Sequence, residues 1–238
     1  MKNQKYDFKY QSSSTDTIKA VLGTIESDAS GFYSFFENED FRGKKIIEKL
    51  LEKDFQFVLD VGSGKKECAN FLKSCGKTVY TNGYTNGINS LDLYDYVGDF
   101  NLIKYDRKFD SVICSHVLEH QLNPNIFLKN IIACTKEGGY ITIIVPPRKP
   151  FIIGGHVSIW NAGLILYHLI LAGIDCSKEC HIKQYDYNIG IIVKNIKIEE
   201  DILKIISYDG GDIDNYLKKY FPLNVYDGFN GDIMELNW

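Results

Sequence analysis

A group of histidine and glutamate residues in the middle of the chain has the side-chain types that bind a metal ion or move a proton. His116, Glu119 and His120 are spaced i, i+3 and i+4, so a helical turn at this point would place them on one face. His156 follows on a separate segment, Gly154-Gly155-His156. Imidazole and carboxylate ligands together suit Mn²⁺, Fe²⁺ or Zn²⁺, and a mixed site with open positions also takes Mg²⁺. The pattern predicts that these four residues hold one divalent ion, Mn²⁺ or Mg²⁺, with His120 and His156 as catalytic residues.

The same residues also fit a site without a metal. Neutral imidazole, with a reference pKa near ~6.5, suits a general base that takes a proton from a hydroxyl group. In this alternative His156 is the base or a substrate contact, and Glu119 and His120 only shape a neighbouring pocket. Activity that survives a chelator but is lost in His156→Ala would favour it.

A second candidate for ligand binding is the glycine-rich stretch Val58-Leu-Asp-Val-Gly-Ser-Gly64. It reads as a strand that runs into a tight turn and then into a helix. Glycines let the backbone approach a ligand closely, and a helix N-terminus offers free N–H groups. The dinucleotide fingerprint GxGxxG is not met, because Lys65-Lys66-Glu67 follows Gly64. The turn therefore predicts a cofactor other than NAD or FAD.

Asp-x-Gly-x-Gly at this place resembles motif I of the class I S-adenosylmethionine-dependent methyltransferases. Three further segments match that family in the expected order. They are Gly98-Asp99-Phe100, Phe109-Asp-Ser-Val-Ile-Cys-Ser-His-Val-Leu-Glu-His120 and Lys136-Glu-Gly-Gly-Tyr-Ile-Thr-Ile-Ile-Val-Pro-Pro147. The resemblance covers roughly Phe55 to Val193, and it implies a methyltransferase that uses S-adenosylmethionine.

The resemblance also implies which residues contact that cofactor. The glycine turn would cradle the methionine part, Asp60 would orient its ammonium group, and Asp99 would accept a hydrogen bond from the adenine amino group with Phe100 beside it. The cofactor-binding set implied in this way is Asp60, Gly62, Ser63, Gly64, Asn82, Asp99, Phe100 and Ser115. One position departs from the family: an acid usually ends the second strand and binds the ribose hydroxyls, whereas this chain has Asn82. An amide can still bind a hydroxyl without charge assistance, or the role falls to a neighbour such as Asp92.

Two subfamilies resemble parts of the candidate site. Small-RNA 2′-O-methyltransferases carry a similar ExxEH set with a later histidine and use it to hold a divalent ion. This chain has His116 where they have the first glutamate. The segment from Pro146 to Gly163 is similar to methyltransferases of bacterial surface-polysaccharide (capsule) synthesis. That similarity implies sugars, nucleotide sugars and phosphoryl or phosphoramidate precursors as methyl acceptors. The segment Arg148-Lys149-Pro150 would then meet an anionic substrate or form a solvated turn.

Short apolar strands alternate with helical patterns and must position these residues. Strands are expected at 55–59, 78–81, 111–114, 140–145 and 189–193. Helices are expected at 43–52, after Gly64, from Asn123 to the glycines at 138–139, and at 161–173. This alternation predicts an α/β fold with a doubly wound, mainly parallel sheet, a Rossmann-like methyltransferase fold whose N-terminal helices cover the ligand edge. We expect one domain, with a helical cap at 1–54, a cofactor-binding core at 55–194 and an extension at 195–238.

Composition narrows the function further. The 238 residues carry 27 basic and 31 acidic side chains, a net charge of −4, which makes nucleic acid an unlikely partner. The six cysteines form no CxxC pair and suggest a reduced, cytoplasmic protein. No apolar run is long enough to span a membrane, and the oligomeric state stays open.

These observations favour O-methylation of a small polar metabolite. Two alternatives come from other functional classes. One is a nucleic-acid methyltransferase, such as an RNA 2′-O-methyltransferase. The other is a non-catalytic cofactor-binding subunit of another methyltransferase, an idea that the missing acid at Asn82 motivates.

Overall fold

A computed structural model describes residues 41–84, 93–149 and 153–238 of the chain. Asp92, Pro150 and residues 1–40, which make up most of the expected N-terminal cap, lie outside the described residues.

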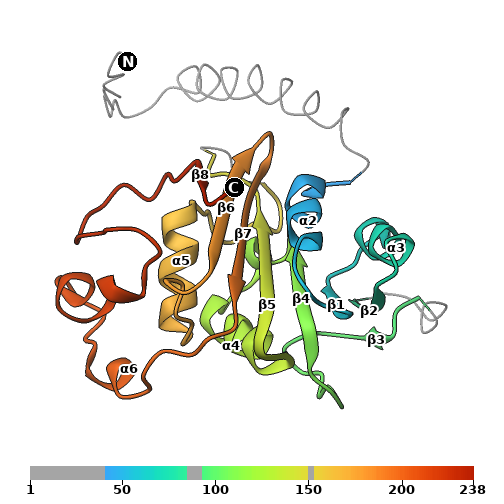
Figure 1. The fold of residues 1–238 in the computed structure, drawn as a ribbon, viewed down its shortest axis with the longest axis horizontal. Coiled ribbons are helices and arrows are strands. Elements are labelled where there is room, and N and C mark those ends of the chain that lie inside the picture. Colours follow the sequence, from blue (N-terminus) through green and yellow to red (C-terminus); the bar gives the residue numbers. More distant parts are fainter. Residues whose placement is uncertain (1–40, 85–92, 150–152) are drawn as a thin grey trace, which may run out of the picture. The chain divides into compact units, whose positions relative to one another are not determined.

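The described chain is organised around one eight-stranded sheet with the order β3-β2-β1-β4-β5-β7-β6-β8 (Figure 1). Strands β3, β2, β1, β4 and β5 are parallel, whereas β7, β6 and β8 join antiparallel. The strands are β1 Phe57–Val61, β2 Thr78–Gly83, β3 Tyr96–Val97, β4 Phe109–Ser115, β5 Thr135–Val145, β6 Cys180–Tyr185, β7 Asn188–Lys194 and β8 Glu235–Leu236. The prediction of a doubly wound, mainly parallel α/β sheet is confirmed.

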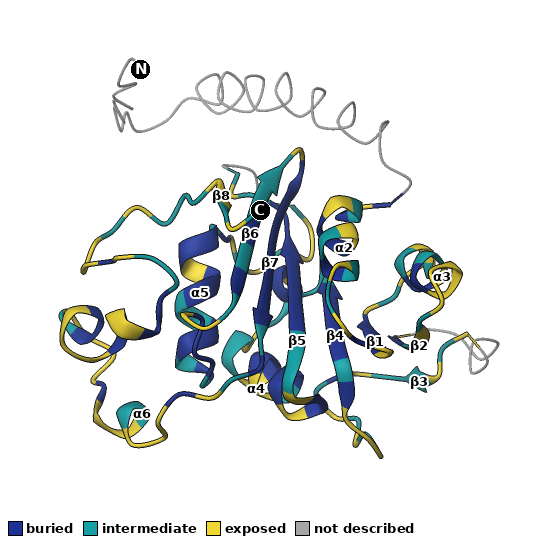
Figure 2. Ribbon diagram, in the orientation of Figure 1, coloured by how far each residue is buried: buried dark blue, intermediate teal, exposed yellow. Residues whose placement is uncertain are grey.

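Apolar helices cover both faces of this sheet. One core cluster joins α2 (Lys44–Leu51) and α3 (Glu67–Ser74) to the sheet, and a larger one joins α4 (Pro124–Cys134) and α5 (Ala162–Leu171) to it. In Figure 2, β4 and β7 are dark blue, that is buried, along most of their length, and β5 is buried over its last five residues, Ile141–Val145. Burial on both faces explains why the carboxyl half of β5 and the middle of β7 are mostly apolar runs rather than alternating sequences.

Helix α2, from the predicted N-terminal cap, packs on a face of the sheet. Ile46 fills the space above Gly190 of β7, where an added Cβ would lie 2.2 Å from the Ile46 side chain. Its first turn lies beside the end of β5, because a Cβ on Gly43 would lie 2.6 Å from Ile144. The described part of the cap is therefore a flanking helix that begins at the carboxyl end of β5.

The helix predicted to run from Asn123 to the glycines at 138–139 ends earlier than expected. Asn123 caps its start as predicted, but α4 stops at Cys134 and Thr135 is already extended. Gly138 has φ 72°, and a Cβ on Gly139 would lie 2.5 Å from the Asp110 carbonyl oxygen. Since Thr135 pairs with Phe109 and Tyr140 with Ser111, the two glycines form a bulge inside β5 rather than a helix end.

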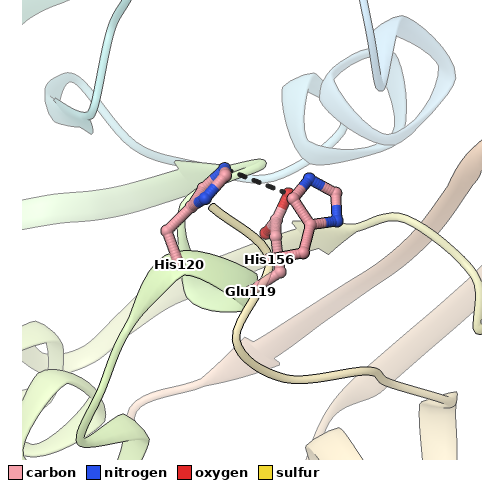
Figure 3. Close-up of side chains that lie close together, drawn as sticks. All are labelled: Glu119, His120 and His156. Carbon is pink, nitrogen blue, oxygen red and sulfur yellow. Dashed lines mark ion pairs between the residues drawn. The ribbon is translucent and has the colours of Figure 1, made fainter. Parts of the chain in front are cut away.

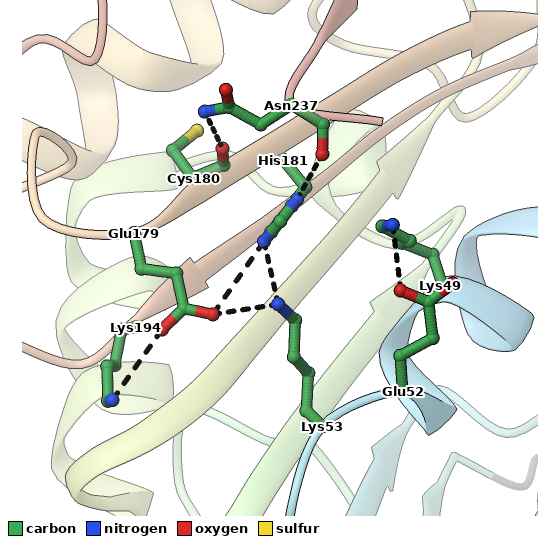
Figure 4. Close-up of polar contacts among 8 residues, drawn as sticks. All are labelled: Lys49, Glu52, Lys53, Glu179, Cys180, His181, Lys194 and Asn237. Atoms are coloured by element: carbon green, nitrogen blue, oxygen red, sulfur yellow. Dashed lines mark hydrogen bonds and ion pairs between the residues drawn. The ribbon is translucent and has the colours of Figure 1, made fainter.

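The last residues of the chain are tied to the sheet by a polar cluster (Figure 4). Lys53, just after α2, lies 2.8 Å from both a Glu179 carboxylate oxygen and Nε2 of His181. The other ring nitrogen of His181 donates to the Asn237 carbonyl oxygen.

Between β7 and this end lie α6 (Ile202–Ile205), a π-helical turn (Ile213–Leu217) and a 3₁₀ turn (Lys218–Tyr220). The extension predicted at 195–238 thus packs onto the α5 side of the core.

Candidate active site

A cavity of about 770 Å³ opens at the carboxyl ends of the parallel strands. This is the edge at which doubly wound sheets bind ligands, and the volume lies within the usual range for small-molecule sites of roughly 300–1,000 Å³. Its lining includes Gly62, Asn82, Asp99, Phe100 and His120, which come from four separate segments of the chain. Four of these belong to the predicted cofactor-binding set.

The glycine turn after β1 forms part of the wall of this cavity without side chains at Gly62 and Gly64. Gly62 has φ 70°, and a Cβ there would lie 2.3 Å from Cγ2 of Val117. Gly64 has φ 50°, and its carbonyl oxygen accepts a hydrogen bond from the Tyr94 hydroxyl at 2.9 Å. The Ser63 hydroxyl is used inside the turn, because it donates to the Asp60 carbonyl oxygen at 2.7 Å. Gly62 is therefore the residue of this turn that lines the cavity, and Ser63 holds the turn in shape.

Asp60, at the end of β1, is a buried carboxyl group without a partner for one of its oxygens. It is 2% exposed, and no described residue donates a hydrogen bond to Oδ2. Burial raises the pKa of Asp60 to about 7, against a smaller opposing effect of Ser63. An unpaired buried oxygen costs free energy unless a donor arrives. The group therefore suits a cation or another donor supplied by a ligand.

Asn82 lines the cavity, but its side-chain N–H groups donate hydrogen bonds to the protein backbone. Its side-chain nitrogen donates to the carbonyl oxygens of Tyr96 and Gly98, at 3.1 and 3.2 Å. These two bonds tie the end of β2 to β3 and to the loop that carries Asp99. A carboxylate has no N–H to donate, which gives the departure from the family pattern a physical reason.

We expect Asn82→Asp to destabilise the protein without improving cofactor affinity. The new carboxylate would face two buried carbonyl oxygens, and each lost partner costs roughly 1–3 kcal/mol. Urea denaturation measures the loss, with Asn70→Asp on the exposed side of α3 as the matched control. A variant as stable as the control, with tighter cofactor binding, would contradict the structural role of Asn82.

Of the remaining predicted cofactor contacts, Asp99 and Phe100 line the cavity and Ser115 does not. Asp99 lines the cavity, and one carboxylate oxygen accepts from the Asn101 N–H at 2.9 Å. Phe100 lines it with one edge while its ring packs on Phe127, with ring centroids 5.1 Å apart. Ser115 ends β4 and is not among the residues that line the cavity.

Next to the cavity, the structure brings together three of the four predicted metal ligands. One ligand atom from each of Glu119, His120 and His156 lies within 4.8 Å of the other two (Figure 3). Two ligands about 2.1 Å from one ion lie at most about 4.2 Å apart, so small side-chain movements would close the set on an ion. No ion is part of the structure.

Backbone hydrogen bonds hold the two segments of this cluster together. The Glu119 carbonyl oxygen accepts from the Val157 and Ser158 N–H groups at 2.9 and 3.3 Å. His120 Nδ1 lies 2.6 Å from the Gly155 carbonyl oxygen, so this nitrogen must carry the proton. Nε2 of neutral His120 is then a free lone pair, and it lies 3.9 Å from a Glu119 oxygen.

Glu119 is the least satisfied polar group of the site. Its side chain is fully buried, and neither carboxylate oxygen accepts a hydrogen bond from any described residue. The nitrogens that approach it present lone pairs rather than protons in their neutral forms. A carboxylate and imidazole lone pairs that meet without a proton between them are the donor set of a cation site.

His116 lies on the far side of Glu119 and outside the three-residue group. The predicted helical turn is a short 3₁₀ turn, Leu118–His120, and His116 precedes it with φ 54°. This left-handed conformation turns the ring toward β7, where Nε2 lies 3.0 Å from the Asn188 side-chain oxygen. Its Nδ1 still lies 3.3 Å from Glu119. His116 therefore contacts Glu119, but it does not share one face with Glu119 and His120 as the spacing predicted.

His156 borders a second, smaller cavity of about 210 Å³. Burial lowers the pKa of His156 below its usual 6.5, and the negative charge of Glu119 opposes this shift. The imidazole is thus neutral near pH 7 and can bind an ion or accept a proton. The second cavity is lined by Pro146, Pro147, Lys149, Ile153, His156, Val157, Ser158, Ile159 and Tyr187.

Sequence reasoning missed two residues of this region, Tyr187 and Asn188. They lie at the tip of the β6–β7 hairpin, and the antiparallel pairing of β7 with β5 brings that tip to the ligand edge. The Tyr187 ring stacks on the His116 ring with centroids 6.1 Å apart. No local motif marks a hairpin tip as part of a site, so only the topology reveals it.

Comparison with known proteins agrees with this arrangement. The model of a family described as a methyltransferase domain matches residues 36–163, more than half of the chain. The protein therefore belongs to this family, and its fold is that of the class I S-adenosylmethionine-dependent methyltransferases. A search of curated proteins found no match.

Solved structures of methyltransferases share the fold at low sequence identity. A SAM-dependent methyltransferase from Archaeoglobus fulgidus is 17% identical over 68% of this chain and 97% of its own, with a TM-score of 0.54. The 1,6-didemethyltoxoflavin-N1-methyltransferase from Burkholderia thailandensis, with 1,6-didemethyltoxoflavin and S-adenosylhomocysteine bound, is 16% identical over 80% of this chain and 93% of its own, also with a TM-score of 0.54. At these identities the likeness shows the fold alone.

Among the residues that the structure describes, no helix has the length and apolar character needed to cross a membrane. The cytoplasmic location stays a prediction from the sequence.

Proposed function

We propose that this methyltransferase transfers a methyl group to an oxygen atom of a small polar metabolite, at the Glu119–His120–His156 cluster. The observation that carries the proposal is the place of this cluster between two cavities. His120 lines the larger cavity, and His156 lines the smaller one. A cofactor in the first and an acceptor in the second would meet beside the cluster.

The larger cavity fits S-adenosylmethionine. Its glycine wall leaves no room for a Cβ at Gly62, and the buried Oδ2 of Asp60, at the end of β1, has no donor among the described residues, a role that the cofactor's ammonium group would fill. Asp99 and Phe100 would hold the adenine, and the Asn82 amide oxygen can accept from a ribose hydroxyl. When bound, this cofactor supplies an electrophilic methyl group on a sulfonium sulfur.

The cluster would activate the acceptor oxygen. In a metal-free cluster, a hydroxyl group would lose its proton to His156 as it attacks, because this imidazole is neutral near pH 7. Glu119, with its unpaired oxygens, would stabilise the resulting imidazolium. Much of the remaining rate enhancement would come from holding the acceptor oxygen and the methyl carbon in line, which is the work of the two cavity walls.

We further propose that Glu119, His120 and His156 hold one divalent ion, Mn²⁺ or Mg²⁺. Two observations support this proposal. Imidazole lone pairs face the buried Glu119 carboxylate, and the Gly155 carbonyl oxygen orients His120, as a backbone carbonyl commonly does for metal-binding histidines. Bound there, the ion would polarise the acceptor oxygen and lower its pKa. His116 would support Glu119 from behind, as a contact rather than as a ligand.

The acceptor class and the setting extend the resemblance described above. Sugars, nucleotide sugars and phosphoryl or phosphoramidate precursors of a bacterial capsule polysaccharide are the acceptors we propose. The idea of a non-catalytic subunit loses its motive, because the amide of Asn82 has a structural use. The net charge of −4 continues to weigh against a nucleic-acid substrate.

A screen with labelled cofactor tests this function. Bacterial extract is incubated with the protein and S-adenosylmethionine labelled in its methyl group, and the small-molecule and RNA fractions are counted separately. We expect label in small molecules, loss of labelling in EDTA, and recovery with Mn²⁺ or Mg²⁺. Label in RNA would support the alternative acceptor, and labelling that persists in EDTA but fails in His156→Ala would leave a metal-free enzyme.

Asp60→Asn is expected to raise stability at pH 8 while it weakens cofactor binding. The pKa of Asp60 is about 7 in the folded protein, above that of an unfolded aspartate, so the unfolded chain loses this proton first as pH rises. Stability is therefore lost between about pH 4 and pH 7, and the uncharged amide avoids that loss. The melting temperatures of the two proteins should agree at pH 4 and diverge at pH 8.

Cofactor affinity should move in the opposite direction. Loss of a hydrogen bond to a charged group costs roughly 1.5–3 kcal/mol, so calorimetry should show at least tenfold weaker binding of S-adenosylmethionine in the variant. Wild-type affinity should increase from pH 6 to pH 8 as Asp60 ionises. An affinity that is flat over this range and unchanged in Asp60→Asn would remove Asp60 from the site.

A further inference from the structure

Among the described residues that line the smaller cavity next to His156, Lys149 is the cationic one in a mostly apolar wall. Lys149 Nζ lies 4.0 Å from the ring centroid of Tyr187, and both residues line the cavity. Tyr187 is 6% exposed, and the Lys149 side chain is partly buried beside it. Burial lowers the pKa of the Lys149 ammonium group. A partly desolvated ammonium attracts an anion more strongly than one in open water does.

A second positive charge acts on residues that line this cavity. Burial raises the pKa of Tyr187 and lowers that of His156, and Arg42, two residues before α2, adds a smaller lowering effect to each. Glu119, which belongs to the cluster, adds a raising effect to each. The pairing of a negatively charged ligand in this cavity therefore depends on Lys149, the cationic residue of its described wall.

The size and rim of the cavity limit what the anion can be attached to. A volume of 210 Å³ holds roughly seven water molecules, enough for one oxyacid group and a short carbon frame. On the rim, Val157 and Ile159 are 55% and 60% exposed, so apolar side chains are available to cover carbon atoms. His156 lines this cavity and belongs to the cluster, so it marks the side on which the reacting oxygen would lie.

We propose that the cavity lined by Lys149, Tyr187 and His156 binds a small anionic methyl acceptor, whose phosphate or carboxylate group pairs with Lys149. The assignment rests on the proposed function for the place of the reacting oxygen, and it adds the charge and size of the acceptor. The anionic group binds at Lys149, the Tyr187 ring and the apolar rim cover the carbon frame, and the acceptor oxygen lies toward His156.

Methyl transfer at this position balances without any further reagent. The acceptor oxygen forms a bond to the methyl carbon as the carbon–sulfur bond of the sulfonium breaks, and the electron pair of that bond stays on sulfur as a thioether. If the oxygen belongs to a hydroxyl group, its proton passes to His156 in the metal-free cluster, or to solvent water when His156 binds the ion. If it belongs to the ionised anionic group itself, no proton moves.

Binding of inorganic phosphate and of acetate, measured by calorimetry in EDTA without metal, tests this assignment. Wild-type protein should bind one of the two anions saturably, and the tighter one identifies the class as phosphate esters or carboxylates. Lys149→Gln should weaken that binding at least tenfold, and Lys149→Arg should retain most of it. Arg148→Gln is the matched control, because Arg148 is exposed and pairs with Asp232 at 2.7 Å.

Several results would overturn the assignment. They are no saturable binding of either anion, equal binding by wild type and Lys149→Gln, or an equal loss in Arg148→Gln. Mn²⁺ binding by Lys149→Gln separates this inference from the proposed function. If Lys149→Gln binds Mn²⁺ normally but has lost anion binding, both proposals are supported. If neither wild type nor Lys149→Gln binds Mn²⁺ while wild type still binds the anion, the metal site is refuted and the anion site stands.

Discussion

Gly62→Ala is expected to reduce the affinity for S-adenosylhomocysteine at least a hundredfold. The added Cβ would lie 2.3 Å from Cγ2 of Val117, and the backbone at φ 70° is one that alanine rarely adopts. Relief of both strains moves the turn that forms the wall of the cofactor cavity. Calorimetry measures the affinity, and thermal unfolding reports whether the variant keeps its fold.

A matched control separates backbone strain from crowding in the cavity wall. Gly76, after α3, has φ 82°, and a Cβ there would meet no described atom within 4 Å. Gly76→Ala therefore carries a similar backbone strain without the contact, and we expect cofactor affinity within about twofold of wild type. Equal losses in the two variants would mean that general destabilisation, and not the cavity wall, explains the effect.

Glu119→Gln is expected to lower methyl transfer by about 10²–10⁴-fold, the usual effect of removing a group that supports proton transfer. The amide has nearly the same shape, but it lacks the charge that binds an ion or stabilises an imidazolium. Because no described residue donates a hydrogen bond to the buried carboxylate, the variant should unfold at the same temperature or a higher one. Affinity for S-adenosylhomocysteine should stay within about twofold.

Glu179→Gln provides the control for this change. Glu179 also lies beside a histidine, His181, at 3.7 Å, but it pairs with Lys53 and Lys194 in the cluster of Figure 4, outside both cavities. We expect it to lose stability and to keep activity, the reverse of Glu119→Gln. Full methyl transfer by Glu119→Gln would exclude Glu119 from the chemistry.

The sheet and its ligand edge were predictable because their signals are local. The mostly apolar run Val58–Val61 followed by Gly62 predicts a strand and a tight turn from adjacent residues alone. Asn123-Pro124 likewise predicts a helix start from two adjacent residues. The glycines at 138 and 139 misled the prediction, since a helix end and a strand bulge both use positive φ and close backbone approach. Only the pairing of β5 with β4 separates the two cases.

The candidate site was predictable in part. The motif gave Glu119 and His120, and the later glycine-histidine segment gave His156, whose contact with them depends on backbone bonds from residues 157 and 158. Spacing placed His116 on the wrong face, because one left-handed residue changes the direction of the chain. Asn82, which the sequence predicted as an uncharged ribose contact, also joins β2 to β3 through its side-chain hydrogen bond to the Tyr96 carbonyl oxygen.

Residues of the second cavity depend on long-range topology. Tyr187 reaches Lys149 only because β7 runs antiparallel to β5, and a single sequence carries no mark of that pairing. The sequence offered Lys149 as one residue of a basic turn. Its aromatic neighbour and its burial distinguish it from the adjacent Arg148, which is exposed.

Titration of Mn²⁺ into the protein, followed by the electron paramagnetic resonance signal of the free ion, tests the central claim most directly. With S-adenosylhomocysteine present, wild-type protein should remove one Mn²⁺ per chain from the free signal. Glu119→Gln and His120→Ala should remove none above background, while Glu179→Gln behaves as wild type. A wild-type protein that leaves all the Mn²⁺ free, or a Glu119→Gln variant that binds it equally well, would contradict a divalent-ion site at Glu119, His120 and His156.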